Sequence, residues 1–528
     1  MSPAAPALPR KKLPVGIQNL REIREGGYYY VDKSGMAVDL IEAGKYYFLS
    51  RPRRFGKSLL VDTFKELFEG NRTLFEGLAA ETRWDWSRHF PVIRISFSDG
   101  MLKSRAELDR RIQSNLRRNR AALGLPRPAD IDPDDTADDL ADLIEQARLT
   151  RGEPVVVLVD EYDKPILDNL THPARAAEMR DGLRNLYSVL KGADPHLKFV
   201  FLTGVSKFSK VSLFSGLNNL RDITLDARWS ALCGYTDADI DTVFAPELSG
   251  LDRDEIRRWY NGYNWRGAGI YNPFDVLLLF DTRQFKAHWF DTGTPTFLVQ
   301  LLAEQSWFTP DLAQLKADEM ELLSFEVEQI GAVALLFQAG YLSVHAVEET
   351  ETRELIYTLG YPNREVEMSL NRVLLPGYGV PGRAASLNRQ SLLKALRGRD
   401  WIAMETTLRA LFASIPSDWY RKNPLAGFEG HYASVFYSHL AGLGLDLRVE
   451  DATSHGRIDL TVVQSGQVFL FEFKVVADEP EGHALRQIRD KGYAEKYLGQ
   501  GVMNVHLIGV EFSRTARNVV GFEVEAAA

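Results

Sequence analysis

Short apolar runs alternate with amphipathic segments along the first part of the chain. The run VVVLVD at 155–160 has five consecutive apolar residues, a pattern typical of a parallel strand covered on both faces. Comparable runs begin at 44, 91 and 197. After the first of them, apolar residues recur at helical spacing, from Leu59 to Phe68. This alternation predicts a parallel α/β sheet within residues 13–230.

The pattern changes after about residue 230. Segments 234–244 and 253–265 have the spacing of amphipathic helices, and 340–370 resembles a hairpin leading into a helix. We therefore predict a helical and winged-helix-like region over 231–375. Clustered proline and glycine predict a linker over 376–394, followed by a separate α/β unit over 395–528. Residues 1–12 are expected to form a flexible tail.

Composition limits the class of protein. With 528 residues, 45% hydrophobic and 26% charged, the chain is expected to be globular with several domains. A net charge of -9 argues against coating nucleic acid through the overall field, although a local basic groove is permitted. The single cysteine, Cys233, excludes an intrachain disulfide and suits a reducing compartment. No apolar run is long enough to cross a bilayer, and no signal-peptide core is evident, so a cytoplasmic location without a membrane partner is expected.

A phosphate-binding loop is indicated by the sequence RPRRFGKS at 51–58. In the pattern G-x-x-x-x-G-K-[ST], backbone N–H groups close on phosphates, and Gly56, Lys57 and Ser58 satisfy its second half. Arg51 stands where the first glycine belongs. The segment lies where a strand turns into a helix, as such a loop requires. We expect Lys57 to reach the β- and γ-phosphates of ATP and Ser58 to ligate Mg²⁺.

Two adjacent carboxylates end the apolar strand at 155–160. Asp160 suits a role in holding Mg²⁺, and Glu161 suits orienting and deprotonating the attacking water, with Asp163 as the next candidate base. Thr203 ends the following strand and is a candidate sensor of the γ-phosphate, because in ATPases with an adjacent catalytic glutamate that strand lies between the two motif strands. The alternative is that both carboxylates only cap a helix after a core strand.

A second site is indicated within residues 456–475, GRIDLTVVQSGQVFLFEFKV. A two-residue turn at Ser465–Gly466 sets a register that places Asp459 opposite Glu472, with Lys474 on the same face. Two carboxylates this close repel unless a cation lies between them, so a hard divalent ion is expected. This set of groups suits metal-assisted phosphodiester cleavage. A charged edge hairpin is the alternative, although the apolar neighbours of Glu472 do not favour it.

These motifs together resemble the bacterial AAA-ATPase-like proteins fused to a PD-(D/E)XK nuclease domain. Matching segments extend over nearly the whole chain: LPVGI (13–17), YVDKS (30–34), RPRRFGKSL (51–59), VDEYDKPI (159–166), LTGVSKFS (202–209), LNNL (217–220), NGYNW (261–265), YNPFDVL (271–277), GYLSV (340–344) and GYPNREV (360–366).

The resemblance implies further residues at the first site. In that family the loop normally reads R-P-R-R-F-G-K-S, so Arg51 belongs to the pattern, and Arg53, Arg54 and Phe55 join it as nucleotide-binding residues. The arginines add fixed positive charge near the phosphates, unless they pair with surface carboxylates instead. The YVDKS segment is implied to belong to the same domain near the base; the alternative is that Asp32 and Lys33 form an ordinary surface pair.

At the second site the resemblance implies two more catalytic residues. The nuclease pattern includes a glutamate on an upstream helix, for which Glu429 is the best match and Glu450 competes. It also includes a downstream glutamine, here Gln487, with Tyr493 as the weaker candidate.

The expected fold class is α/β multidomain, with a P-loop ATPase sheet, a helical and winged-helix-like middle, and a C-terminal restriction-endonuclease-like domain. The expected function is ATP hydrolysis coupled to Mg²⁺-dependent cleavage of nucleic acid, with DNA favoured and Mn²⁺ possible at the nuclease site. One alternative is a nucleotide-controlled switch whose nuclease-like domain only binds nucleic acid or a protein partner. A third hypothesis is an ATPase that acts on protein partners. Oligomeric state and strand type are left open.

Overall fold

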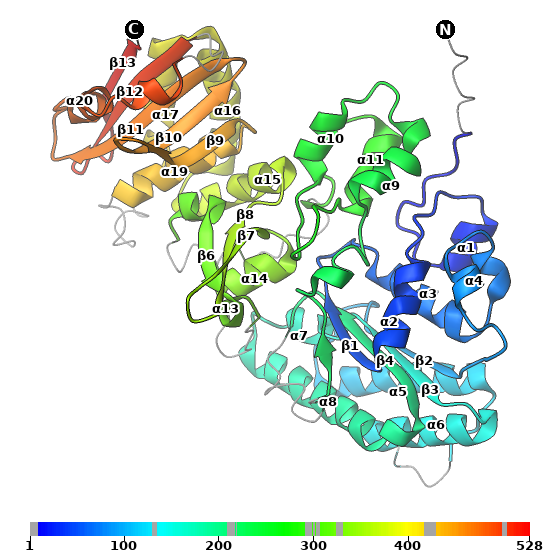
Figure 1. Cartoon of the computed structure of the whole chain (residues 1–528). Helices are drawn as coiled ribbons and strands as arrows, with labels where there is room; N and C mark the ends of the chain where they lie inside the picture. The colour runs from blue at the N-terminus through cyan, green and yellow to red at the C-terminus, as the bar shows by residue number, and fades with distance from the viewer. Residues whose placement is uncertain are drawn as a thin grey trace, which may run out of the picture. The chain divides into compact units, whose positions relative to one another are not determined.

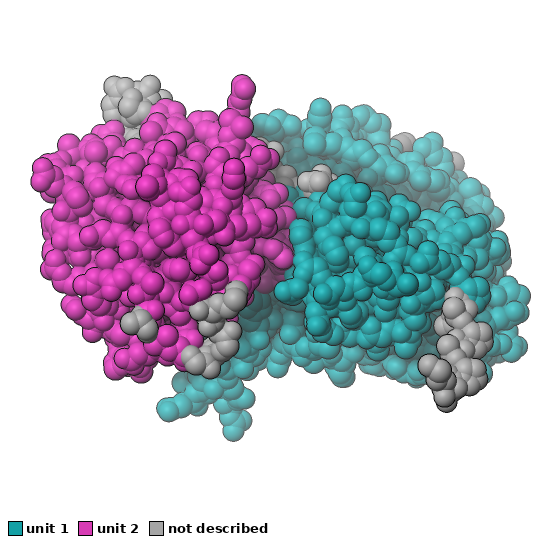
Figure 2. All heavy atoms as spheres, turned by 90° about the horizontal axis from the view of Figure 1, so that it is seen from above, with its two compact units in different colours: residues 1–292, 316–358 teal, residues 293–315, 359–528 magenta. Residues whose placement is uncertain are grey.

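The computed structural model forms two compact units, which Figure 2 draws in separate colours. Unit 1 comprises Met1–Thr292 and Lys316–Thr358, and unit 2 comprises Gly293–Leu315 and Leu359–Ala528. The chain therefore enters unit 2 for a short segment and returns to unit 1, which the predicted boundaries did not anticipate. The structure describes residues 9–128, 132, 135–207, 217, 219–290, 298, 301–302, 307–323, 331–416, 429–498 and 504–527.

A parallel sheet forms the centre of the N-terminal part of unit 1 (Figure 1). Its five described strands are β1 (Tyr46–Ser50), β2 (Val92–Ser96), β3 (Val155–Asp160), β4 (Leu197–Gly204) and β5 (Arg221–Asp222). Their order is β2-β3-β4-β1-β5, and every pairing is parallel. All residues of β3 are buried, as expected for a strand covered on both faces. The predicted parallel sheet is confirmed, and so is the position of β4 between the two motif strands.

Helices pack around this sheet. They are α1 (Leu20–Glu25), α2 (Ser34–Ala43), α3 (Lys57–Phe68), α4 (Ala80–Arg83), α5 (Arg105–Leu123), α6 (Thr136–Arg151), α7 (Lys164–Leu167) and α8 (Pro173–Gly192). Helix α3 contacts β3 and β4, α5 contacts β2, and α6 contacts β3. The phosphate-loop segment between β1 and α3 therefore lies at the carboxyl end of a buried parallel strand.

The middle of the chain is mainly helical and ends in a small sheet. Its elements are α9 (Asp237–Thr242), α10 (Arg253–Tyr260), α11 (Pro273–Thr282), β6 (Leu315–Asp318), α13 (Glu319–Leu323), α14 (Ala332–Ala339), β7 (Ser343–Glu349) and β8 (Leu355–Gly360). The sheet order is β6-β8-β7. Strands β7 and β8, followed by a helix from Arg364, match the predicted hairpin and helix. No described helix combines the length and apolar character that a membrane crossing requires.

Unit 2 is built on a mixed sheet with the order β13-β12-β11-β10-β9. Its described strands are β9 (Asp446–Thr453), β10 (Gly456–Gln464), β11 (Gln467–Val476), β12 (Asn504–Ser513) and β13 (Asn518–Ala526). Strands β11 and β12 are parallel, and the other pairings are antiparallel. Its helices are α15 (Arg364–Leu374), α16 (Gly382–Gly398), α17 (Trp401–Ala413), α19 (Glu429–Ala441) and α20 (His483–Asp490), with the short 3-10 helices η6 (Thr309–Ala313) and η7 (Leu375–Tyr378).

The segment predicted as a linker is mostly helical. Residues 376–378 belong to η7, and α16 begins at Gly382 and continues to Gly398. Pro381 is the N-cap residue of α16. The prediction was wrong because proline and glycine here mark the end of one helix and the start of the next. The same residues are also common in linkers, so composition did not separate the two cases.

Candidate active sites

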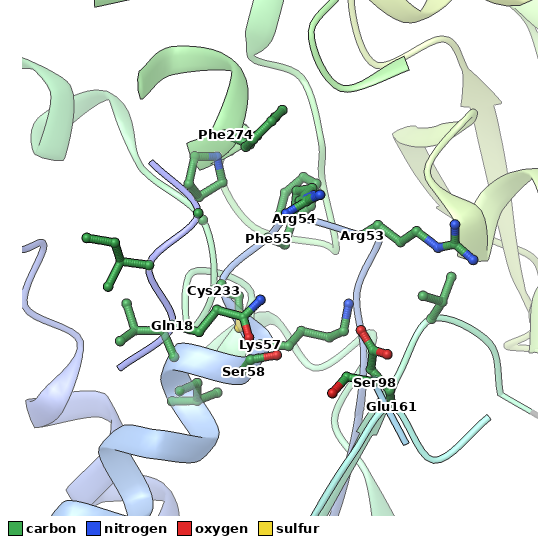
Figure 3. A pocket seen from close by; sticks show the side chains of 18 of the residues that line it. Gln18, Arg53, Arg54, Phe55, Lys57, Ser58, Ser98, Glu161, Cys233 and Phe274 are labelled. Atoms are coloured by element: carbon green, nitrogen blue, oxygen red, sulfur yellow. The ribbon is translucent and has the colours of Figure 1, made fainter. Parts of the chain in front are cut away.

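A cavity of about 590 Å³ opens at the carboxyl end of the parallel sheet. Its wall includes the loop residues Gly56, Lys57 and Ser58 and the carboxylate of Glu161. Figure 3 shows the side chains of Lys57, Ser58 and Glu161 converging in this space. Of the residues that the sequence proposed for phosphate binding and catalysis, the structure thus brings Gly56, Lys57, Ser58 and Glu161 together.

The loop before α3 leaves its N–H groups open to an anion. Gly56 has a φ of 88°, which favours glycine, and it is the N-cap of α3 without a side-chain hydrogen bond. A Cβ atom at this position would meet nothing within 4 Å, so backbone conformation explains the glycine better than space does. The N-terminus of this 12-residue helix therefore presents unpaired amides beside Lys57.

Lys57 is held by the loop itself. Its Nζ donates to the carbonyl oxygens of Arg51 and Pro52, each at 2.9 Å, and the residue is 7% exposed. Burial lowers the pKa of Lys57, and the negative charges of Glu161 and Asp160 oppose this shift. The ammonium is therefore placed between the loop and the carboxylates, where a phosphate can replace the carbonyl contacts.

Arg51 does not lie in the wall of the cavity, which corrects its assignment to the nucleotide. Its guanidinium is fully buried and donates to the carbonyl oxygens of Ser50 (2.8 Å), Thr224 (3.0 Å) and Trp229 (3.3 Å). It also lies over the Trp265 ring, 4.0 Å from the ring centre. Burial lowers the pKa of Arg51 to about 10. Arg51 thus connects the loop to residues 224–265 and acts as a structural cation.

We expect Arg51→Met to destabilise unit 1 by several kcal/mol. Three buried carbonyl oxygens would lose this donor, although that of Trp229 would keep the Leu232 N–H. A buried acceptor left without a partner costs about 1–3 kcal/mol. Scanning calorimetry of the full chain should show a lower midpoint temperature for the unfolding of unit 1. Arg53→Met removes the same charge from an exposed side chain two residues away and should leave that midpoint temperature nearly unchanged. Equal stability of the two variants would contradict the structural role.

The other loop residues have distinct environments. Arg53 and Arg54 are exposed and line the cavity, and the Arg54 guanidinium lies over the Phe274 ring at 4.9 Å. Phe55 contributes to the wall, but its ring is buried and packs edge-on against Tyr263 (4.7 Å) and Trp265 (5.4 Å). Phe55 therefore anchors the loop, whereas the two arginines are available to phosphate.

The carboxylates at the end of β3 differ in environment. Asp160 is 2% exposed, and within the described part of the chain its Oδ1 has no hydrogen-bond partner. A buried, unpartnered carboxylate oxygen fits a divalent cation. Glu161 lines the cavity with a left-handed φ of 53°, which is costly for a residue other than glycine. Burial raises the pKa of Glu161, Lys57 opposes the shift, and Asp160 adds to it.

Thr203 and Asp163 are both engaged by the backbone. The Thr203 hydroxyl donates to the Leu49 carbonyl at 2.8 Å, and the residue is fully buried outside the cavity wall, which corrects its assignment as a γ-phosphate sensor. A threonine between two buried strands satisfies its hydroxyl locally.

Asp163 Oδ2 accepts N–H groups from Val205 (2.9 Å) and Ser206 (2.6 Å), and burial raises the pKa of Asp163 to about 6. Asp163 therefore holds the loop after β4.

Sequence reasoning assigned no individual residues to the remainder of the cavity. Apolar and aromatic residues form much of the rest of the wall, including Pro14, Ile17, Tyr30, Tyr235, Phe274 and Leu277. An apolar wall of this kind suits a nucleobase. Several of these residues lie in the motifs LPVGI, YVDKS and YNPFDVL. These motifs contributed to the family resemblance, but their residue types did not indicate a chemical role. In YVDKS, Lys33 donates to Asp239 at 2.8 Å, so the alternative of an Asp32–Lys33 pair is wrong.

The hairpin of unit 2 has the predicted register over its outer part. Ser465 and Gly466 form the turn with positive φ values, and pairs run from Gln464–Gln467 to Leu460–Phe471. The ladder between β10 and β11 stops before Asp459 and Glu472. Asp459 instead accepts the Phe473 N–H at 2.8 Å through Oδ2. The paired register thus ends one residue before Asp459 and Glu472, so their direct opposition stays a prediction, while Asp459 lies close enough to add to the raised pKa of Glu472.

Glu472 is the central carboxylate of this second site. It is 1% exposed, and its Oε1 accepts from Lys474 Nζ at 3.1 Å and from Gln487 Nε2 on α20. Among described residues its buried Oε2 has no partner. Burial raises the pKa of Glu472 to about 7, and Asp459 adds to the shift. The orphaned oxygen beside a second carboxylate fits a divalent cation.

A smaller cavity of about 240 Å³ adjoins this site. Asp459, Glu450 and Tyr437 line it. Partial burial raises the pKa of Glu450, and Asp459 adds to this shift. Glu429 begins α19, but its side chain is outside the described residues, so its assignment stays a prediction. No three described His, Cys, Asp or Glu side chains are grouped to hold a metal ion.

Comparison with known proteins relates two parts of the chain to known families. Residues 14–214 match the family described as "Predicted AAA-ATPase", and residues 427–522 match the PD-(D/E)XK nuclease superfamily. The chain is also 59% identical over 520 residues to a protein of Azotobacter chroococcum mcd 1 described as "Uncharacterized protein in vnfD 5'region", covering 98% of this chain and 99% of the relative. No solved structure matches.

Proposed function

Since this chain belongs to the family that joins a predicted AAA-ATPase domain to a PD-(D/E)XK nuclease superfamily domain, we propose that it hydrolyses ATP and cleaves nucleic acid, DNA in particular. The observation that supports the ATPase is the convergence of Lys57, Ser58 and Glu161 on one cavity. The observation that supports the nuclease is the buried Glu472, held by Lys474 and Gln487 beside Asp459.

In the ATPase, the phosphates lie on the open amides of α3, and the base lies against the apolar wall. Lys57 exchanges its two carbonyl contacts for phosphate oxygens, while Arg53 and Arg54 add positive charge at the rim. Glu161 orients the attacking water and accepts its proton. Mg²⁺, held by Ser58 and Asp160, would offset the charge of the β- and γ-phosphates.

In the nuclease, Asp459 and Glu472 hold a divalent cation, Mg²⁺ or Mn²⁺, which would offset the negative charge of the scissile phosphate. Lys474 positions the attacking water next to Glu472. Gln487 keeps Oε1 of Glu472 occupied, so that Oε2 stays available for the cation. Glu429 or Glu450 supplies a further carboxylate in this proposal.

Glu161→Gln should separate nucleotide binding from hydrolysis. Asp160 and Lys57 remain in place, but no base accepts the proton of the water, so turnover should fall by at least about 100-fold. Calorimetry should show retained ATP affinity, and phosphate release should show the loss of turnover. Hydrolysis at the parental rate would shift the role of base to Asp163, whose carboxylate already accepts two backbone N–H groups.

A second candidate function is a nucleotide-controlled switch whose nuclease-like domain only binds nucleic acid or a protein partner. Cleavage assays on single- and double-stranded DNA and RNA, with Mg²⁺ or Mn²⁺ and with or without ATP, discriminate the two. Slow ATP hydrolysis without cleavage of any substrate would favour the switch.

A further inference from the structure

A carboxylate from a neighbouring strand holds the N-terminus of α20. The helix begins after Gly482, which has a φ of 66° and offers no side-chain cap. The first N–H groups of a helix lack intrahelical acceptors, and a side chain at the N-cap normally accepts one of them. Here the carboxylate of Glu511 on β12 accepts four backbone N–H groups. They belong to Glu481 (2.5 Å), Gly482 (3.1 Å), His483 (2.6 Å) and Ala484 (3.2 Å).

Glu511 is buried and ionised at this contact. The residue is 2% exposed, with both carboxylate oxygens accepting backbone N–H groups. Burial acts to raise the pKa of Glu511, but the four N–H groups outweigh it and the pKa is lowered. The positive end of the helix dipole favours the same ionised state. The carboxylate is thus a charged, buried anchor for α20.

A second contact seats α20 on the same strand. Gly509 pairs with Glu472 in the register between β11 and β12, and Glu511 pairs with Lys474. A Cβ atom on Gly509 would lie 2.4 Å from the backbone nitrogen of Leu485. The backbone of α20 therefore lies directly on β12 next to the proposed metal site, and a small shift of the helix would move every side chain that it carries.

One of those side chains is Gln487, which donates to Oε1 of Glu472. We propose that Glu511 is a positioning residue: by anchoring the N-terminus of α20 it fixes Gln487 against Glu472 and so sets the orientation of that carboxylate. The importance of this orientation for metal binding and cleavage rests on the nuclease function proposed above. Outer contacts of this kind typically change metal affinity or activity by about 10–100-fold.

The first test needs neither metal nor activity. In the full chain with ¹⁵N-labelled glutamine, the side-chain amide signal of Gln487 is identified by its loss in Gln487→Ala. Glu511→Gln should move this signal toward that of a free amide and speed hydrogen exchange over 483–490. Glu511→Asp, which keeps the charge with a shorter reach, should give a smaller change and serves if the first variant does not fold.

The matched control is Glu525→Gln. Glu525 also binds α20, through Arg489, but at the exposed surface and away from the helix N-terminus. It should leave the Gln487 signal unchanged. An unchanged Gln487 signal in folded Glu511 variants would overturn the proposal.

The second test measures Mn²⁺ affinity by calorimetry. Glu511→Gln and Gln487→Ala should each weaken binding by about 10–100-fold, and the double variant should be no weaker than Gln487→Ala alone. Additive losses would mean that Glu511 does not act through Gln487 and would overturn the proposal. If the unmodified protein binds no Mn²⁺, the proposed metal-dependent nuclease fails, while the Gln487 signal still decides the positioning role.

Discussion

Lys57→Ala will lower the affinity of the full chain for ATP by about 100-fold, and hydrolysis will fall with it. A buried, charge-assisted contact to phosphate is worth about 3 kcal/mol, which corresponds to this factor. In the absence of nucleotide the ammonium binds the carbonyl oxygens of Arg51 and Pro52, contacts that phosphate oxygens can replace at little cost. Titration calorimetry measures the affinity, and phosphate release measures turnover.

A matched control lies on the same helix. Lys65 is near the end of α3, where its ammonium pairs with Glu66 and Glu69 outside the cavity. Lys65→Ala should leave ATP affinity unchanged. Parental affinity in a folded Lys57→Ala protein would remove the basis for a nucleotide site in this cavity.

Asp459→Asn and Glu472→Gln will each reduce nucleic-acid cleavage by at least about 100-fold, because each removes a proposed cation ligand. ATP hydrolysis in unit 1 should persist in both variants. In melting experiments, Mn²⁺ should raise the midpoint of the unmodified protein by a few degrees, and this rise should shrink in both variants. Asp459→Asn should also slightly stabilise the metal-free protein, because it relieves repulsion with the buried Glu472.

Lys474→Ala provides the internal control for this series. A lysine ammonium is not a metal ligand, so the Mn²⁺-dependent rise should persist while cleavage is impaired. The contact from Gln487 to Oε1 of Glu472 remains in this variant. If all three variants keep the full rise, Asp459 and Glu472 do not form a metal site, and the switch-only function becomes the better proposal.

Local patterns predicted the elements that carry both sites. The buried run at 155–160, the helical spacing after Lys57 and the glycine before it sufficed to place the phosphate loop between a strand and a helix, because each signal arises within a few residues. The two-residue turn at 465–466 likewise sufficed for the register of β10 and β11 up to Leu460. The paired register ends one residue before Asp459, whose side-chain Oδ2 accepts the Phe473 N–H.

Roles that depend on distant partners were not predictable in the same way. Arg51 and Thr203 lie at positions where charge or polarity suggested phosphate contacts. Their hydrogen-bond partners come from other strands and loops. Arg51 donates to the carbonyl oxygens of Thr224 and Trp229, and Thr203 donates to that of Leu49. Nothing near Glu511 in the sequence indicates that its carboxylate caps a helix some thirty residues earlier.

The sequence by itself indicated the candidate groups at each proposed site: Lys57, Ser58, Asp160 and Glu161 for a nucleotide, and the carboxylates and lysine of the hairpin for a cation. Tertiary structure alone decided which polar groups face a cavity and which, like Arg51, are buried and hydrogen-bonded inside the protein. The physical reason is that a buried polar group must find a hydrogen-bond partner, and the partner available depends on elements that meet only when the chain is folded.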